Sequence, residues 1–218
     1  MRKILYHGSL EIISTPMYGQ GKVYNDYGQG FYCTESLELA KEWSCAERED
    51  GYVNQYEMDE TGLLILNLME KHYSVLHWLA ILMKYRKMKR GREWLLEHFL
   101  PDVDGYDVVI GYRADDSYFS FARAFVNNEI SLEQLSYAMR LGKLGEQYVL
   151  KSQKAFQAIH FLSYEGVDSV EYYVKRRARD EQARNAYRKK VEEDDIDGIY
   201  MRDLIRGEVS AEDERLWD

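Results

Sequence analysis

Cysteine and proline are both scarce in this chain of 218 residues, which has two of each. The cysteines, Cys33 and Cys45, are too few for a disulfide scaffold, and their spacing does not match a metal site. We therefore expect a reduced, cytoplasmic setting and no bound metal. The chain also lacks Gly/Ser linkers, low-complexity tracts and internal repeats. The sequence predicts one compact body with a C-terminal extension.

Long apolar runs are missing as well. The longest, around Val75–Met83, is interrupted by His77 and is far shorter than the ~20 residues of a membrane-spanning helix. The first residues of the chain contain too short an apolar run for a secretory signal peptide. We therefore expect neither membrane insertion nor secretion by that route.

The chain has no excess of positive charge, because 29 basic and 38 acidic residues give a net charge of −9. This balance argues against a surface coated in positive charge for non-specific DNA binding. Two segments, Lys84–Arg92 and Val174–Lys190, are nevertheless locally rich in basic residues. Each is most simply interpreted as a solvated helix face, and the alternative is docking of a nucleic acid or an acidic partner.

A hydrophobic share of 45% suits a globular core rather than a disordered chain. Alternating or β-branched apolar runs predict strands, and apolar residues three or four apart predict helices. The predicted strands are Ile4–His7, Phe31–Thr34, Tyr52–Asp59, Gly62–Leu68, Tyr106–Tyr112 and Gln147–Lys151. The predicted helices are Ser36–Ala46, Ser74–Met88, Glu93–Phe99, Ser131–Leu141, Ser152–Phe161 and Val174–Glu193. A helix or a turn is predicted at Ser120–Val126 and at Ile199–Arg206. This pattern predicts an α+β fold, in which residues 1–170 form a split mixed β-sheet with helices around it and residues 171–218 form a charged helical extension packed on that core.

Three short motifs contain the residues that are candidates for catalysis or ligand binding. Tyr6-His7-Gly8-Ser9 ends the first predicted strand, and Tyr27-Gly28-Gln29-Gly30-Phe31-Tyr32-Cys33-Thr34 enters the second. Gly145-Glu146-Gln147-Tyr148-Val149 lies at the start of a late strand. A histidine at a strand end, or a Gly-x-Gly turn, is more often structural when it stands alone. The order and spacing of all three motifs favour a functional site.

Together these motifs resemble the diphtheria-toxin and poly-ADP-ribose-polymerase branch of the ADP-ribosyltransferase superfamily. In that branch His-Gly-Ser/Thr belongs to the first strand, Tyr-Gly-x-Gly-x-Tyr enters a strand followed by a helix, and Glu-Tyr-Ile/Val-Val forms the third motif. More closely, the chain resembles an uncharacterised bacterial family of ADP-ribosyltransferase-like proteins. The further residues of that likeness are Asp26-Tyr27-Gly28, Ala114-Asp115-Asp116 and Lys175-Arg176-Arg177-Ala178-Arg179.

The resemblance implies that NAD is the co-substrate and gives roles to named residues. It implies a catalytic set of His7, Tyr32, Gln147 and Asp116. It implies NAD contacts from His7, Gly8, Ser9, Tyr27, Gly30, Phe31, Tyr32 and Asp115. His7 would bind a ribose hydroxyl, the Gly8 backbone would hold the nicotinamide carboxamide, and Tyr32 would stack on the nicotinamide ring. Because nicotinamide leaves as a neutral molecule, the reaction needs stabilisation of an oxocarbenium-like ribose rather than a strong acid.

The third motif departs from the branch pattern, since Gln147 stands where the polymerase-type members have a glutamate. Glu146 is its neighbour, and neighbouring residues of a strand point to opposite faces, so only one of the two can reach a cleft. A glutamine can hold a ribose hydroxyl but cannot act as a base. This favours transfer of a single ADP-ribose, or no transfer, over chain elongation.

Three functions stay open at this point. The first is an intracellular bacterial mono-ADP-ribosyltransferase that modifies a protein or a nucleic acid. For this function the resemblance implies the role of the toxin in a toxin–antitoxin pair, with a small antitoxin protein as partner. The second is a catalytically silent fold of the same type that acts as a binding module. The third, favoured least, is an enzyme similar to the NAD-using RNA 2′-phosphotransferases. For Asp115 and Asp116 the alternative to a catalytic role is a turn or a helix cap.

Overall fold

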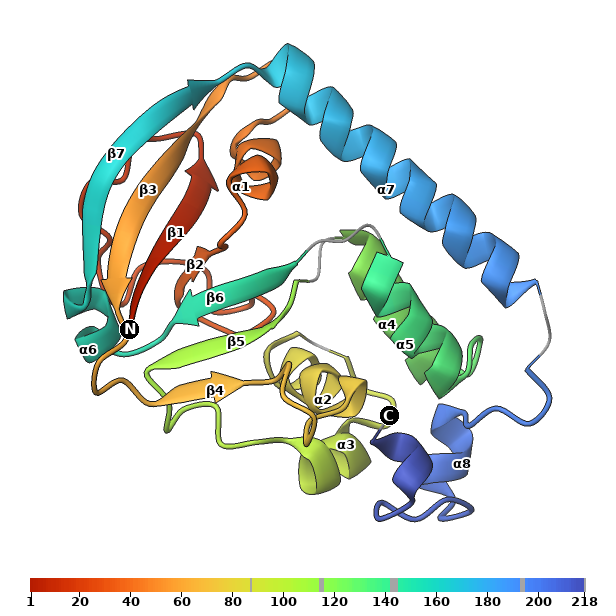
Figure 1. Ribbon diagram of the computed structural model, residues 1–218. Coiled ribbons are helices and arrows are strands. Elements are labelled where there is room, and N and C mark those ends of the chain that lie inside the picture. The colour runs from red at the N-terminus through yellow and green to blue at the C-terminus, as the bar shows by residue number, and fades with distance from the viewer. Residues whose placement is uncertain (87, 114–115, 142–144, 193–194, 218) are drawn as a thin grey trace.

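The computed structural model shows an α+β protein built on two β-sheets (Figure 1). It describes residues 1–86, 88–113, 116–141, 145–192 and 195–217. The predicted fold class is confirmed, and so is the arrangement of the strands in two separate groups with helices around them. Within the described ranges, no helix combines the length and the apolar character that crossing a bilayer requires.

The first sheet is antiparallel and contains β1 (Arg2–Ser9), β3 (Gly51–Asp59) and β7 (Ile159–Val167) in the order β1-β3-β7. Helix α1 (Leu37–Ser44) packs against β1 and β3. This helix begins where the sequence predicts, because the Ser36 side chain accepts a hydrogen bond from the Leu39 amide.

The second sheet is mixed and has the order β2-β6-β5-β4. It is formed by β2 (Phe31–Cys33), β6 (Glu146–Leu150), β5 (Val108–Tyr112) and β4 (Ile65–Asn67), and only the β4–β5 pair is parallel. Tyr6 of β1 and Thr34, next to β2, exchange two backbone hydrogen bonds of 2.8 and 2.9 Å. The two sheets therefore meet between Tyr6, inside β1, and Thr34, directly after β2.

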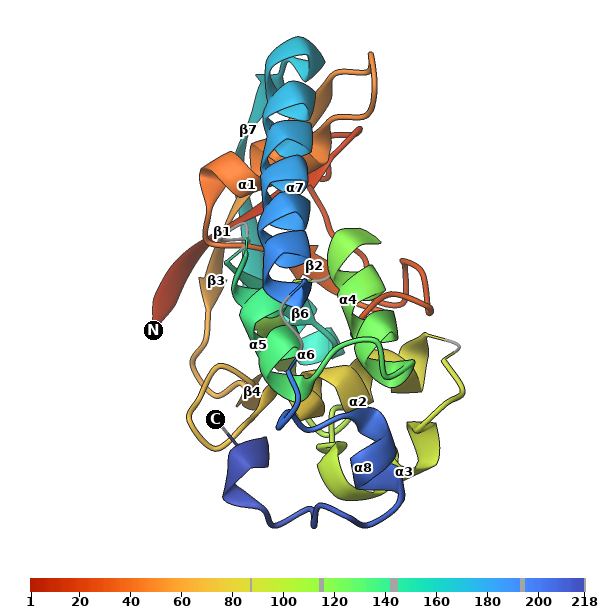
Figure 2. The same cartoon turned by 90° about the vertical axis from the view of Figure 1, so that its right-hand side faces the viewer.

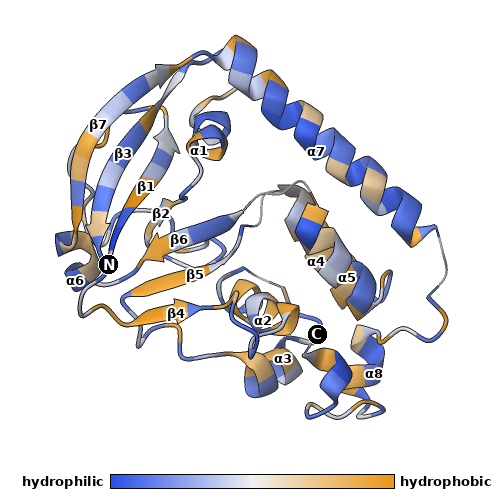
Figure 3. Ribbon diagram, in the orientation of Figure 1, coloured by the Kyte–Doolittle hydropathy of each residue, from blue (hydrophilic) through white to orange (hydrophobic). Residues whose placement is uncertain are grey.

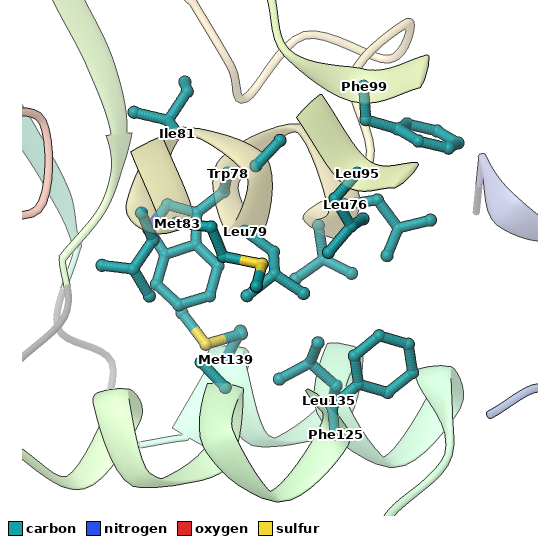
Figure 4. Packing of buried hydrophobic residues seen from close by; sticks show 14 of the residues in the cluster. Leu76, Trp78, Leu79, Ile81, Met83, Leu95, Phe99, Phe125, Leu135 and Met139 are labelled. Atoms are coloured by element: carbon teal, nitrogen blue, oxygen red, sulfur yellow. The ribbon is translucent and has the colours of Figure 1, made fainter. Parts of the chain in front are cut away.

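The larger core lies between the second sheet and a group of helices. Every residue of α2 (Val75–Tyr85) from Val75 to Met83 is buried, which is the pattern of a helix enclosed on all sides. Side chains of α2 face Phe125 of α4 (Asp116–Val126) and Met139 of α5 (Leu132–Arg140), as Figure 4 shows. Helix α3 (Arg92–Phe99) closes the outer side of α2.

The charged C-terminal extension begins with α7 (Ser169–Val191), a helix of 23 residues. It crosses from the end of the first sheet towards α5 and has a largely hydrophilic surface (Figures 1, 2 and 3). Arg179 ties it to α1 through an ion pair with Glu42. The last part of the chain, with α8 (Met201–Ile205), contributes Met201, Leu204 and Leu216 to the larger core. The end of the extension is therefore integral to the packing of residues 1–170.

One predicted helix is wrong in its second half. The segment Ser152–Phe161 forms only a short helix, α6 (Gln153–Gln157), and the chain then enters β7 at Ile159. Strand β7 pairs with β3 along its whole length, and most of its residues between the ends are exposed. An exposed edge strand lacks the strict apolar alternation that identifies a half-buried one, so its sequence did not separate it from the preceding helix.

The N-terminus of α2 gives the fold a pH dependence. His77 is buried, and its Nδ1 accepts a hydrogen bond of 3.0 Å from the Ser74 amide. Burial lowers the pKa of His77 from 6.5 to about 4, so protons bind the unfolded chain more readily in that window. We expect the neutral His77 to contribute on the order of 3 kcal/mol to the free energy of unfolding. This contribution is complete above about pH 6.5 and is lost as the pH falls to about 4.

Urea unfolding at pH 7.5 and pH 4.5 measures this contribution. His77→Gln keeps an acceptor for the cap and removes the titration, so the variant should lose less stability on acidification than the wild type. An equal loss in both proteins would show that His77 does not titrate in this way.

Candidate functional site

A cavity of about 760 Å³ lies where the two sheets meet, a volume within the usual range for small-molecule sites. His7 reaches it from β1, Phe31 and Tyr32 from β2, and Gln147 from β6. The segment between β1 and β2 forms the facing wall with Glu11–Met17, Gln20–Lys22 and Asn25–Asp26. Three residues that are far apart in the sequence, His7, Tyr32 and Gln147, therefore share one cavity.

His7 is held as a neutral imidazole with a defined tautomer. Its Nδ1 lies 2.6 Å from the carbonyl oxygen of Tyr32, and this carbonyl can only accept, so Nδ1 carries the proton. Burial lowers the pKa of His7 below 6.5. The other ring nitrogen, Nε2, then has a lone pair and is a hydrogen-bond acceptor. The Phe31 ring packs at 4.5 Å from the imidazole, which fixes its plane.

Tyr32 lines the cavity and also holds the glycine-rich turn. Its hydroxyl donates to the Gly28 carbonyl at 2.5 Å and accepts from the Tyr27 amide at 3.2 Å. Tyr27 itself is fully buried, does not line the cavity, and donates from its hydroxyl to the Tyr112 carbonyl at 2.6 Å. Of the aromatic residues proposed for NAD contact, Phe31 and Tyr32 line the cavity, whereas Tyr27 is buried in the core and does not line it.

Gln147 and Glu146 have different surroundings in the structure. Glu146 is exposed and does not line the cavity, whereas Gln147 is a lining residue that is only 7% exposed. In the part of the chain that the structure describes, Gln147 Oε1 has no hydrogen-bond partner. A buried polar atom without a partner costs about 1–3 kcal/mol, which a ligand that donates a hydrogen bond would recover.

Gly8 is required for the packing of α1 on β1. A Cβ at this position would lie 2.1 Å from the Ala40 carbonyl oxygen and 2.8 Å from the Ser44 amide nitrogen, so only glycine lets α1 approach β1. Tyr6 directs its N–H and C=O towards Thr34, and alternate residues of a strand repeat this direction. The Gly8 N–H and C=O therefore point to the β2 side of β1, but Gly8 is not among the described residues that line the cavity.

The remaining predicted site residues are Ser9, Gly30, Asp115 and Asp116. Gly30 lines the cavity, and Ser9 lies beside it and donates a hydrogen bond of 2.6 Å to the Glu11 carbonyl. Asp116 begins α4, and its side-chain position is not described. Asp115 lies outside the described residues.

Arg113 and the pair of Arg86 and Asp26 line the cavity but were not predicted as site residues from the sequence. Arg113 follows β5, and its guanidinium carbon lies 3.0 Å from the centroid of the Trp43 indole ring. Arg86 donates from Nε and Nη2 to Asp26 Oδ1 at 3.0 and 2.6 Å, and both residues line the cavity. Arg113 stands just before the acidic pair Asp115-Asp116, and Asp26 belongs to the quoted motif Asp26-Tyr27-Gly28, so both lie at local signals of the sequence.

The fold and the cavity define a two-sheet α+β protein with a ligand-sized site at the junction of its sheets. The chain belongs to the family described as Protein of unknown function (DUF3990), whose model matches residues 3–161. That match covers both sheets down to the start of β7 and includes every lining residue of the cavity. Searches among curated proteins and among solved structures each found no match.

Proposed function

We propose that the protein is an NAD-dependent mono-ADP-ribosyltransferase. The observation that carries this proposal is that His7, Phe31, Tyr32 and Gln147, from three strands and all three motifs, line one cavity. The volume of about 760 Å³ is suitable for a folded dinucleotide. The division into two sheets that meet at this cavity agrees with the split-sheet core of the superfamily whose motifs the sequence resembles.

The polar groups of the cavity suit ribose hydroxyls. His7 Nε2 is an acceptor, and Gln147 Oε1 is a buried acceptor without a partner among the described residues. Both therefore require a ligand that donates hydrogen bonds, and each ribose of NAD offers two hydroxyl donors. This matching of acceptors to donors supports ribose hydroxyls over phosphate oxygens at this end of the cavity.

The walls also suit the nicotinamide end of NAD. Its ring is a planar cation, which the face of an aromatic side chain attracts. Tyr32 and Phe31 supply aromatic surface to the cavity. The backbone of Gly8, next in the chain to the lining residue His7, would hold the carboxamide. In the reaction the bond from ribose C1′ to the ring nitrogen breaks and its electron pair leaves with nicotinamide. The nucleophilic atom of the acceptor then forms the new bond at C1′ and gives up its proton to solvent, while Gln147, which cannot act as a base, only positions the ribose.

Incubation of the purified protein with labelled NAD tests the proposal. We expect release of nicotinamide and transfer of the label to a macromolecule of a bacterial lysate, with proteinase and nuclease treatment telling a protein acceptor from a nucleic acid. Neither release nor transfer, in protein shown to be folded, would contradict it.

Gln147→Ala is expected to reduce nicotinamide release at least about tenfold, because one hydrogen bond to the ribose is lost. The fold should persist, since the deleted amide makes no Oε1 bond within the described structure. Nicotinamide quantified by chromatography, alongside the thermal unfolding curve, measures both effects. Gln157→Ala, a change on the short helix α6 outside the cavity, is the matched control. Unchanged release by folded Gln147→Ala would remove Gln147 from the site.

A second candidate function is NAD binding without transfer. The specific observation in its favour is that Gln147, and not Glu146, faces the cavity, so no carboxylate stands at the third-motif position. In that case NAD would raise the unfolding temperature, because it binds only the native state, and no nicotinamide would be released. The same labelled-NAD experiment, paired with a thermal shift, distinguishes the two functions.

A further inference from the structure

The segment that follows β1 is fixed far more firmly than an ordinary surface loop. Asn54 of β3 is fully buried and uses both ends of its amide on this segment. Its Nδ2 donates to Ser9 Oγ at 3.1 Å and to the Glu11 carbonyl at 3.2 Å, and its Oδ1 accepts from the Ile13 amide at 2.9 Å. A buried amide satisfied in this way sets the path of the backbone on both sides of Glu11.

A second buried side chain fixes the far end of the same segment. Tyr56, also of β3 and fully buried, donates from its hydroxyl to the Ile13 carbonyl at 2.5 Å. Both the N–H and the C=O of Ile13 are therefore bound to β3 side chains. Because buried groups of the sheet hold it, the position of Glu11 is set by the fold and not by contacts with solvent.

The fixed segment places a carboxylate at the cavity. Glu11 is exposed and lines the cavity together with His7 and Gln147. Those two groups are uncharged in the native protein. Asp26, the other described carboxylate of the lining, is bound to Arg86. Among the described lining residues, Glu11 is thus the carboxylate that forms no ion pair with a neighbouring side chain.

We infer that Glu11 is a catalytic residue that stabilises the positive charge on the nicotinamide ribose. This inference rests on the proposed function. As the bond from C1′ to nicotinamide breaks, the charge moves from the ring to the ribose. A carboxylate at the cavity, carried by a backbone segment that the sheet holds in place, would face that ribose and favour the transition state. The carboxylate stays ionised throughout and transfers no proton. It supplies the negative charge that a glutamine at position 147 cannot.

Glu11→Gln tests the inference, because it keeps the size of the side chain and removes its charge. We expect the kcat of nicotinamide release to fall at least about 30-fold, with the Kd of NAD from calorimetry changed no more than about threefold, since the charge acts mainly in the transition state. Glu97→Gln is the matched control, an exposed glutamate on α3 that lies outside the cavity, and it should leave both values unchanged.

The possible outcomes separate the inference from the function on which it rests. A kcat of Glu11→Gln within threefold of wild type, in protein that does release nicotinamide, overturns the role of Glu11 and leaves the transferase proposal standing. A weaker Kd with unchanged kcat makes Glu11 a binding group and also overturns the inference. A wild-type protein that binds NAD but releases no nicotinamide overturns both.

Discussion

Replacing His7 with alanine is expected to reduce nicotinamide release on the order of 100-fold. The variant loses the Nε2 acceptor for a ribose hydroxyl, and an unpaired polar group in a buried site costs about 1–3 kcal/mol, or up to about two factors of ten. It also loses the 2.6 Å bond to the Tyr32 carbonyl and the ring contact with Phe31, so two further cavity residues become less well positioned. Both losses lower the rate of nicotinamide release.

The matched control is His160→Ala, which removes an exposed histidine of β7 outside the cavity. Steady-state nicotinamide release, NAD affinity and thermal unfolding are compared for the two variants and the wild type. We expect His160→Ala to behave as wild type. If His7→Ala were folded and active within threefold of the wild type, the imidazole would not contact the substrate.

Gly8→Ala is expected to destabilise the fold by about 3 kcal/mol or more, which is at the upper end for overpacking. The added methyl group would lie 2.1 Å from the Ala40 carbonyl oxygen, and that neighbour is helix backbone that cannot rotate away. Helix α1 would have to move off β1, and the junction of the two sheets at Tyr6 and Thr34 lies at the same place. For a chain of this length we expect the unfolding temperature to fall by about 6–12 °C.

Gly166→Ala provides the comparison, because Gly166 is also a strand glycine but a Cβ there would meet nothing within 4 Å. Its unfolding temperature should differ little from that of the wild type. Differential scanning calorimetry measures both variants. Equal unfolding temperatures for Gly8→Ala and Gly166→Ala would show that α1 does not pack on β1 as closely as described.

Local signals predicted most elements of the fold. Helices α1 and α5 begin after Ser36 and Ser131, whose side chains accept hydrogen bonds from the first turn, and β5 follows from an apolar, β-branched run. Strand β7 could not be predicted in this way. Its place in the sheet depends on pairing with β3, about a hundred residues earlier in the sequence, and its exposed residues leave little local pattern.

Some residues of the candidate site could be predicted from local sequence motifs, and others could not. The motifs identified His7, Tyr32 and Gln147, and the strand alternation left the choice between Gln147 and Glu146 open until burial decided it. Glu11 and Arg86 could not be found from motifs. Arg86 reaches the cavity through a pairing with Asp26 sixty residues away, and Glu11 is positioned by a buried asparagine of another strand.

The crystal structure of the protein soaked with NAD tests the central claim most directly. We predict density for the dinucleotide in the cavity at the junction of the sheets, with ribose hydroxyls within hydrogen-bond distance of His7 Nε2 and Gln147 Oε1. NAD bound elsewhere, or a cavity that stays without ligand at saturating NAD, would contradict the account.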